Sequence, residues 1–168
     1  MQKPPRRIDI PPRNSGNRKR ALDDHVPAGR IAHFLQTVTY DGSSKHKRFP
    51  HRFKLPPFRG ERGDATLCDA HAHFEPEDWP SIMPMIQRGL RAGLVGTNIW
   101  AVADNGWIFE GAVTNVTKSE YHGYPVRPSE PIAGEVYRRF RRWVDSQGSQ
   151  RDKQAAANCA ARYRFRDG

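Results

Sequence analysis

The 168-residue chain has little cysteine, fewer acidic than basic residues and no long hydrophobic segment. Cys68 and Cys159 are its only cysteines, too few for a disulfide scaffold or a four-cysteine zinc site. No run of about 18 apolar residues is present, so we expect neither a transmembrane helix nor a membrane partner. The opening residues MQKPPRRIDIPPRN lack the apolar core of a classical signal peptide, which favours a cytoplasmic protein.

Positive charge is what the chain has in excess. Lys and Arg number 28 against 18 Asp and Glu, which gives a formal net charge of +10. The excess is concentrated in residues 1–20, 43–63 and 138–168. A strongly basic protein attracts partners of negative charge. We therefore expect a nucleic-acid partner, RNA rather than DNA, with an acidic inhibitor protein as the alternative.

The composition divides the chain into three parts. Residues 1–27 begin with a basic, proline-rich stretch and are expected to form a disordered arm. Residues 28–147 carry the hydrophobic patterning of a single domain. Residues 148–168 are basic and rich in alanine, and we interpret them as a tail that either extends as helix or frays.

The clearest local signal is a hairpin over Ile99–Val113. Two β-rich runs, IWAVAD and WIFEGAV, flank the dipeptide at 105–106, Asn-Gly. Asn-Gly favours a two-residue turn in which both residues have positive φ. Such a turn predicts that Asp104 pairs with Trp107 and that Val102 pairs with Phe109.

The remaining elements complete an α+β prediction. Apolar residues at helical spacing predict helices over residues 28–38, 81–91 and 130–147. Residues 66–74 alternate as a strand does, and residues 121–126 are expected to form a short edge strand. A small antiparallel sheet flanked by helices defines the α+β class.

One motif carries metal-ligand chemistry. Residues 69–74, DAHAHF, resemble the first metal-ligand segment of the amidohydrolase superfamily, in which two histidines leave one strand and bind a divalent metal. The resemblance implies a metal-dependent hydrolase with Asp69, His71 and His73 at the metal. That superfamily is a TIM barrel, which 168 residues are too few to build. A local zinc site that adds Cys68 is a second option, although neighbouring strand residues face opposite ways. The leading expectation is therefore no cofactor, with the two histidines on an exposed strand face.

A basic loop is the first candidate nucleic-acid contact. Residues 39–58 are interrupted by turn residues and prolines, so we expect them to be irregular. Their cations can neutralise phosphates, and the phenylalanines between them can stack on unpaired bases. The predicted contacts in this loop are Lys45, Lys47, Arg48, Arg52 and Lys54. His46 and His51 lie among these cations, as acid–base catalysis in a metal-independent ribonuclease requires. The alternative is a solvated loop whose Phe side chains pack on the domain.

A second candidate segment, EYHGYP, lies between the hairpin and the last predicted helix. His122 can act as a base and Tyr124 as an acid, next to the flexible Gly123. The alternative is an edge strand with a packed tyrosine and a solvent-facing histidine. Arg138 and Arg142, in the last predicted helix, either contact phosphates or form the exposed face of an amphipathic helix.

These patterns lead to hypotheses of different classes. The leading one is a metal-independent ribonuclease, because the size, the order of helix before sheet and the scattered histidines are similar to toxin-type ribonucleases as a class. The second is a protein that binds nucleic acid without cutting it. The third is an interaction module for an acidic protein, or a metal-dependent hydrolase using His71 and His73. Net charge alone supports several of them, because it reports the sign of the partner and not the chemistry.

Overall fold

The computed structural model describes residues 20–40, 50–53, 56–61, 82–115 and 120–166. Inside these ranges, residues 52–53, 113–115, 120–122 and 124 are described by their backbone alone. The predicted strand over residues 66–74 and the part of the predicted arm that precedes Arg20 lie outside the described residues.

Four strands form one sheet, in the order β1-β4-β3-β2. They are β1 (Thr39–Tyr40), β2 (Ile99–Val102), β3 (Ile108–Asn115) and β4 (Glu120–Pro125). β3 pairs antiparallel with both β2 and β4, whereas β1 pairs parallel with β4. The sheet is therefore mixed rather than wholly antiparallel, and β4 is an inner strand rather than the expected edge strand. β1 lies in a segment expected to be irregular, because a two-residue strand is too short to show alternation.

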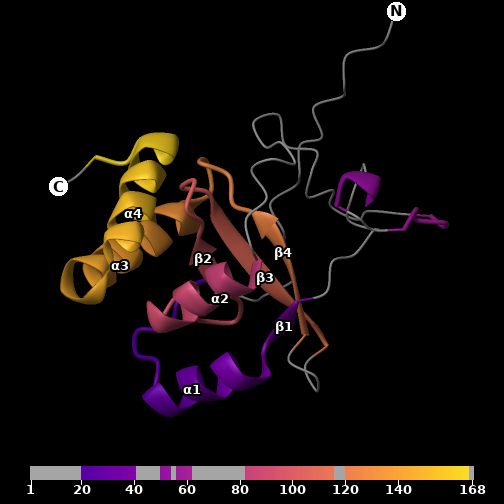
Figure 1. Ribbon diagram of the computed structural model, residues 1–168, viewed down its shortest axis with the longest axis horizontal. Helices are drawn as coiled ribbons and strands as arrows, with labels where there is room; N and C mark the ends of the chain where they lie inside the picture. Colours follow the sequence, from indigo (N-terminus) through magenta and orange to yellow (C-terminus); the bar gives the residue numbers. More distant parts are fainter. Residues whose placement is uncertain (1–19, 41–49, 54–55, 62–81, 116–119, 167–168) are drawn as a thin grey trace, which may run out of the picture.

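Two pairs of helices cover the sheet, which confirms the α+β class (Figure 1). The helices are α1 (Ala28–Thr37), α2 (Ile82–Arg91), α3 (Pro131–Gln147) and α4 (Gln150–Tyr163). Ile99 of β2 packs in a buried cluster with residues of α1 and α2, while its neighbour Trp100 packs with residues of α3 and α4. Successive strand residues face opposite sides, so the two helix pairs lie on opposite faces of the sheet. The first three helices match their predicted ranges to within a residue at each end.

α4 lies where the sequence suggested a basic tail, and it is part of the domain. Its buried face consists of Asp152, Ala155, Ala156, Cys159 and Tyr163. The Tyr163 hydroxyl donates to the Val126 carbonyl oxygen at 2.7 Å and accepts from the Ile108 amide at 3.0 Å. Ser149 and Asp152 form a capping box that begins the helix. Of the two expected outcomes for this segment, helix is the one observed. Hydropathy did not decide between them, because α4 buries small alanines and a hydrogen-bonded tyrosine rather than a large apolar stripe.

The domain also begins earlier than predicted. Residues 20–27, assigned to the disordered arm, pack on the folded body. The side chain of Leu22 is buried, and the Asp23 amide donates to the Val95 carbonyl oxygen at 2.8 Å. Arg20 binds two carboxylates, described below. Nothing in the sequence distinguishes Arg20 from the other cations of the arm, because its partners Glu110 and Glu130 lie far away along the chain.

The hairpin is present, but its register differs by one residue from the prediction. Val102 lies opposite Ile108 rather than Phe109, and residues 103–107 join the strands, with the Ala103 amide donating to the Trp107 carbonyl oxygen at 2.8 Å. Among the described non-glycine residues, only Arg164 has positive φ, so Asn105 does not, and the predicted two-residue turn is excluded. Gly106, at φ +89, closes a turn in which its amide donates to the Ala103 carbonyl oxygen at 2.9 Å.

Candidate functional site

Much of the predicted basic loop and the whole metal motif lie outside the described residues. Outside the described residues lie Lys45, His46, Lys47, Arg48, Lys54, Asp69, His71 and His73. His51 is exposed in the short 3-10 helix η2 (Pro50–Phe53), and Arg52 is placed there by its backbone alone. Figure 1 shows η2 to one side of the sheet, away from β4. The structure therefore does not bring His51 to His122 and Tyr124.

His122 and Tyr124 are two residues apart in β4, where only their backbone positions are described. The strand register places His122 opposite Ala112 and Tyr124 opposite Glu110. Gly123 between them lies opposite Gly111. This register puts both predicted catalytic residues next to the part of β3 that carries the buried charge of the sheet.

Glu110 is that buried charge, and it was not among the residues predicted from the sequence. Its side chain is 0% exposed, and it accepts a hydrogen bond from Asn98 at 2.6 Å. Arg20 binds it with two guanidinium nitrogens, one of them Nε at 3.1 Å. Arg20 also donates to Glu130 at 2.7 Å. A lone acid inside the β-rich run WIFEGAV was the available signal, because a carboxylate buried in a sheet needs a charged or hydrogen-bonding partner.

The electrostatics of this group favour a fixed ion pair. Burial alone would lower the pKa of Arg20, but its hydrogen bonds and charge interactions with Glu110 and Glu130 outweigh burial and raise that pKa above its usual value. The guanidinium therefore stays charged, and it joins the start of the described chain to β3 and to the residue preceding α3. Its role is to hold these elements together.

A second ion-pair network joins α2, the hairpin loop and α4. Arg88 of α2 is buried, donates to the Val102 carbonyl oxygen at 2.9 Å and pairs with Asp152 at 2.9 Å. Asp104 in the hairpin loop pairs with both Arg88 and Arg151. The hydrogen bond from Arg151 lowers the pKa of Asp104, burial partly opposes that effect, and Arg88 lowers the pKa further. Arg88 is buried in this network and is not available to a ligand, whereas the Arg151 side chain is 73% exposed beside Asp104.

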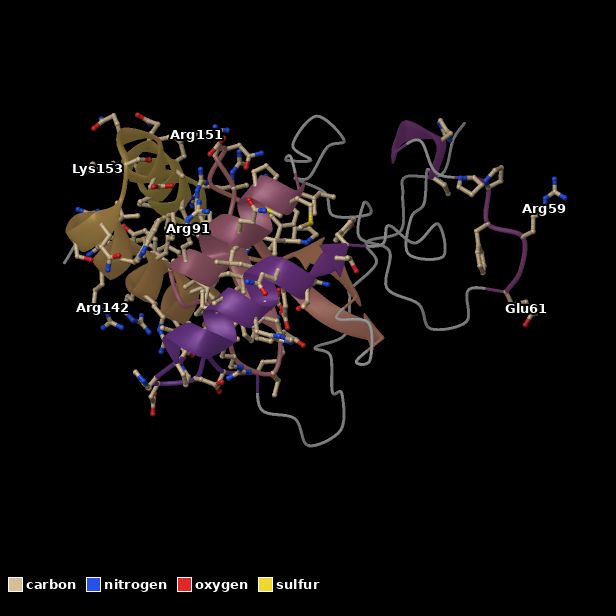
Figure 2. All side chains as sticks on the ribbon, turned by 60° about the horizontal axis from the view of Figure 1, so that its bottom comes forward. Arg59, Glu61, Arg91, Arg142, Arg151 and Lys153 are labelled. Carbon is tan, nitrogen blue, oxygen red and sulfur yellow. The ribbon has the colours of Figure 1, made fainter. Side chains whose placement is uncertain are left out.

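Other cations have no such partner. In the part of the chain that the structure describes, several exposed cations have no hydrogen bond or ion pair. They are Arg59, Arg91, Arg138, Arg142, Lys153, Arg164 and Arg166. Figure 2 shows the side chains of Arg142 and Lys153 at the outside of the α3–α4 pair. We call residues 131–166, which contain α3, α4 and the turn after α4, the basic helical hairpin. The sequence predicted Arg138 and Arg142 within it but missed Arg164 and Arg166.

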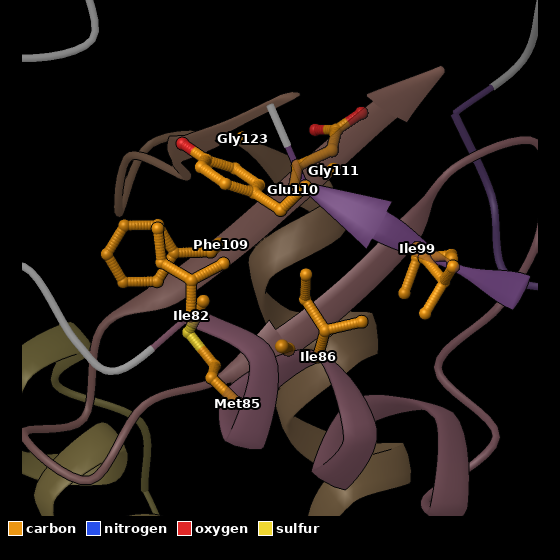
Figure 3. Close-up of a pocket in the computed structure, with 11 residues that line it drawn as sticks. Ile82, Met85, Ile86, Ile99, Phe109, Glu110, Gly111 and Gly123 are labelled. Atoms are coloured by element: carbon orange, nitrogen blue, oxygen red, sulfur yellow. The ribbon is translucent and has the colours of Figure 1, made fainter. Parts of the chain in front are cut away.

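A hollow between α2 and the sheet has a different character (Figure 3). Apolar walls come from Val38, Ile82, Met85, Ile86, Ile99, Ala101 and Phe109. Gly111 and Gly123 leave its floor without side chains, and the space measures about 450 Å³, including the part open to solvent. Figure 3 shows the carboxylate of Glu110 pointing away from Met85 and Ile86. The hollow suits an apolar group and not a phosphate.

No cluster of three or more His, Cys, Asp or Glu side chains that could hold a metal ion occurs among the described residues. Nor does any helix in the described ranges have the length and hydropathy needed to cross a membrane. No protein-family model, curated protein or solved structure matches the chain.

Proposed function

We propose that the protein binds nucleic acid, RNA first, through its basic helical hairpin. Residues 131–166 contain nine basic and three acidic residues. The observation that carries the proposal is that all three acids are engaged within the protein. Asp145 accepts from Arg141 at 3.0 Å, Asp152 pairs with Arg88 at 2.9 Å, and Glu135 accepts from the Leu22 amide at 3.3 Å.

The charge left on the hairpin is therefore uncompensated. Among its described residues, Arg138, Arg142, Lys153, Arg164 and Arg166 are exposed and unpaired. Exposed cations attract phosphates and release the counterions condensed on a nucleic acid. Each contact to single-stranded RNA steepens the dependence of log Kd on log salt concentration by about 0.7.

The test is a salt titration of binding to labelled single-stranded RNA and to duplex DNA. The double variant Arg138→Ala with Arg142→Ala should weaken binding and lower the salt slope by about 0.7 for each lost contact. The matched control, Arg141→Ala with Asp145→Ala, removes an ion pair from the same helix and leaves the net charge unchanged. Equal effects of the two pairs, or wild-type binding without salt dependence, would contradict the proposal.

A ribonuclease activity is the second candidate, because β4 places His122 and Tyr124 two residues apart in an inner strand beside β3. In this proposal His122 takes the 2′-hydroxyl proton, Tyr124 protonates the leaving 5′ oxygen and an arginine stabilises the phosphorane. RNA cleavage should persist in EDTA and be lost in His122→Ala and in Tyr124→Phe. Cleavage that EDTA abolishes would instead favour the metal hypothesis of His71 and His73.

Binding without cleavage would leave the protein as a nucleic-acid-binding module. Weak binding to every nucleic acid, together with tight binding to an acidic protein, would favour the inhibitor-type partner that the same charge accommodates. The three outcomes are separable because cleavage, salt slope and protein binding are independent measurements.

A further inference from the structure

The turn after α4 contains the one strained residue found in the described part of the chain. Arg164 adopts φ 57 and ψ 37, and it alone among the described non-glycine residues has positive φ. The amides of Arg164 and Phe165 both donate to the Ala160 carbonyl oxygen, the latter at 2.9 Å. This position at the end of a helix is usually glycine, because a side chain there is strained.

Helix closure alone does not explain an arginine here. Glycine would end α4 with the same hydrogen bonds and without strain. The Arg164 side chain is exposed and, as far as the described residues extend, makes no hydrogen bond or ion pair. No contact of this side chain with the described residues therefore stabilises the fold. A strained residue that does not stabilise the fold points to a role in function, such as binding a ligand.

Phe165 fixes the chain on which Arg164 and Arg166 lie. Its ring stacks on Tyr137 of α3 with centroids 4.8 Å apart and on Tyr163 of α4 with centroids 5.5 Å apart. Both tyrosines are buried, so the turn is held against the domain rather than free. Arg164 and Arg166, one on each side of this anchor, are exposed.

A third cation is close to the same anchor. A Cβ placed on Gly134 would lie 3.3 Å from a guanidinium nitrogen of Arg138 and 3.9 Å from the Phe165 ring. Arg138 and Phe165 are therefore both adjacent to the small surface left open by Gly134. Arg138 therefore lies beside the turn on which the exposed residues Arg164 and Arg166 are carried.

We propose that Arg138, Arg164 and Arg166 form a binding site for the phosphodiester backbone of single-stranded RNA, and that Arg164 makes this contact from its strained position. The inference rests on the proposed nucleic-acid binding and names the part of the hairpin that carries it. Guanidinium groups suit phosphate because their planar donors can bind two oxygens at once. Fixing the turn through Phe165 reduces the entropy lost when the cations bind.

Two substitutions at Arg164 test the proposal. Arg164→Gly removes both strain and charge, so we expect a melting temperature about 2–4 °C higher and an RNA salt slope lower by about 0.7. Arg164→Lys keeps both, so its melting temperature and salt slope should stay near those of the wild-type protein. The protein would thus become more stable and bind RNA more weakly through one substitution.

The outcomes separate the two proposals. Wild-type protein that shows no salt-dependent RNA binding would overturn the proposed function and this site together. Salt-dependent binding that Arg164→Gly leaves unchanged would overturn the site alone. A lower melting temperature for Arg164→Gly would show that Arg164 contributes to the fold, and would overturn the argument from strain.

Discussion

Gly93 and Gly106 both have positive φ, but different structural requirements favour glycine at the two positions. Gly93, at φ +69, ends α2 in a Schellman motif, in which the Leu94 amide donates to the Gly89 carbonyl oxygen at 2.9 Å. A Cβ at Gly93 would have no atom within 4 Å. A Cβ at Gly106 would lie 2.5 Å from the carbonyl oxygen of Asn158 in α4. Gly106 therefore serves both the hairpin loop and the close approach of α4.

This difference gives a matched pair of stability measurements. Gly93→Ala should lower the free energy of unfolding by about 1 kcal/mol, the cost of a side chain at positive φ. Gly106→Ala should lower it by about 3 kcal/mol or more, because backbone atoms of α4 must also move. Urea unfolding of both variants measures the difference. Equal losses would show that α4 does not press on the hairpin loop.

At the scale of elements, the sequence predicted the helices and the hairpin whose signals lie in neighbouring residues. The stripe Ile132, Val136 and Phe140 predicted α3, and all three residues are buried. The Asn-Gly dipeptide located the hairpin correctly, but its register was wrong because contact with α4 is not visible in local sequence. The sequence allowed a helix at residues 148–168 but did not predict that it packs into the domain. Its burial depends on contacts with residues far away in sequence, such as the hydrogen bond from the Ile108 amide to the Tyr163 hydroxyl.

The candidate site was less predictable from the sequence than the helices and strands. Arg138 and Arg142 are unpaired because the acidic residues of α3 and α4 are hydrogen-bonded to other groups, and composition does not reveal those partners. Glu110 and Arg20 form an ion pair although 90 positions separate them in the sequence, so local patterns do not predict it. Only the proximity of His122 and Tyr124 follows from the chain itself, since strand neighbours two apart need no tertiary information.

The reactivity of the Cys159 thiol measures whether α4 is packed against the rest of the domain. The thiol is fully buried, and burial raises its pKa to about 12, so thiolate is scarce at neutral pH. In a Cys68→Ser background, we expect maleimide to label the native protein slowly and the urea-unfolded protein rapidly. Asp152→Ala, which removes the capping box, should accelerate native-state labelling by loosening α4. Rapid labelling of the native protein would contradict the packing of α4.

At the scale of the whole molecule, stability should depend on acid through the network that joins α2, the hairpin and α4. The pKa of Asp104 is lowered below its ordinary value of 3.8, first by the hydrogen bond from Arg151. The unfolded carboxylate therefore takes up a proton at higher pH than the folded one. The contribution of Asp104 is complete well above pH 3.8 and is lost as the pH falls through the lower, folded pKa.

Comparing the wild-type protein with Asp104→Asn isolates this contribution. The wild-type protein should be the more stable of the two at neutral pH, and the difference should shrink progressively below about pH 5. Urea unfolding over that range gives the free energies. A difference that grows on acidification would mean that the carboxylate is not stabilised by the two arginines.

The parallel pairing of β1 with β4 has a consequence for the order in which the molecule assembles. Thr39 lies opposite Glu120, and Arg20 reaches Glu130 across 110 positions, whereas β2, β3 and their loop are contiguous. Closing a long loop costs entropy before its contacts can form, so the hairpin and α3 with α4 should assemble first. The N-terminal segment then docks last, onto a surface already formed, and folding should take milliseconds or longer.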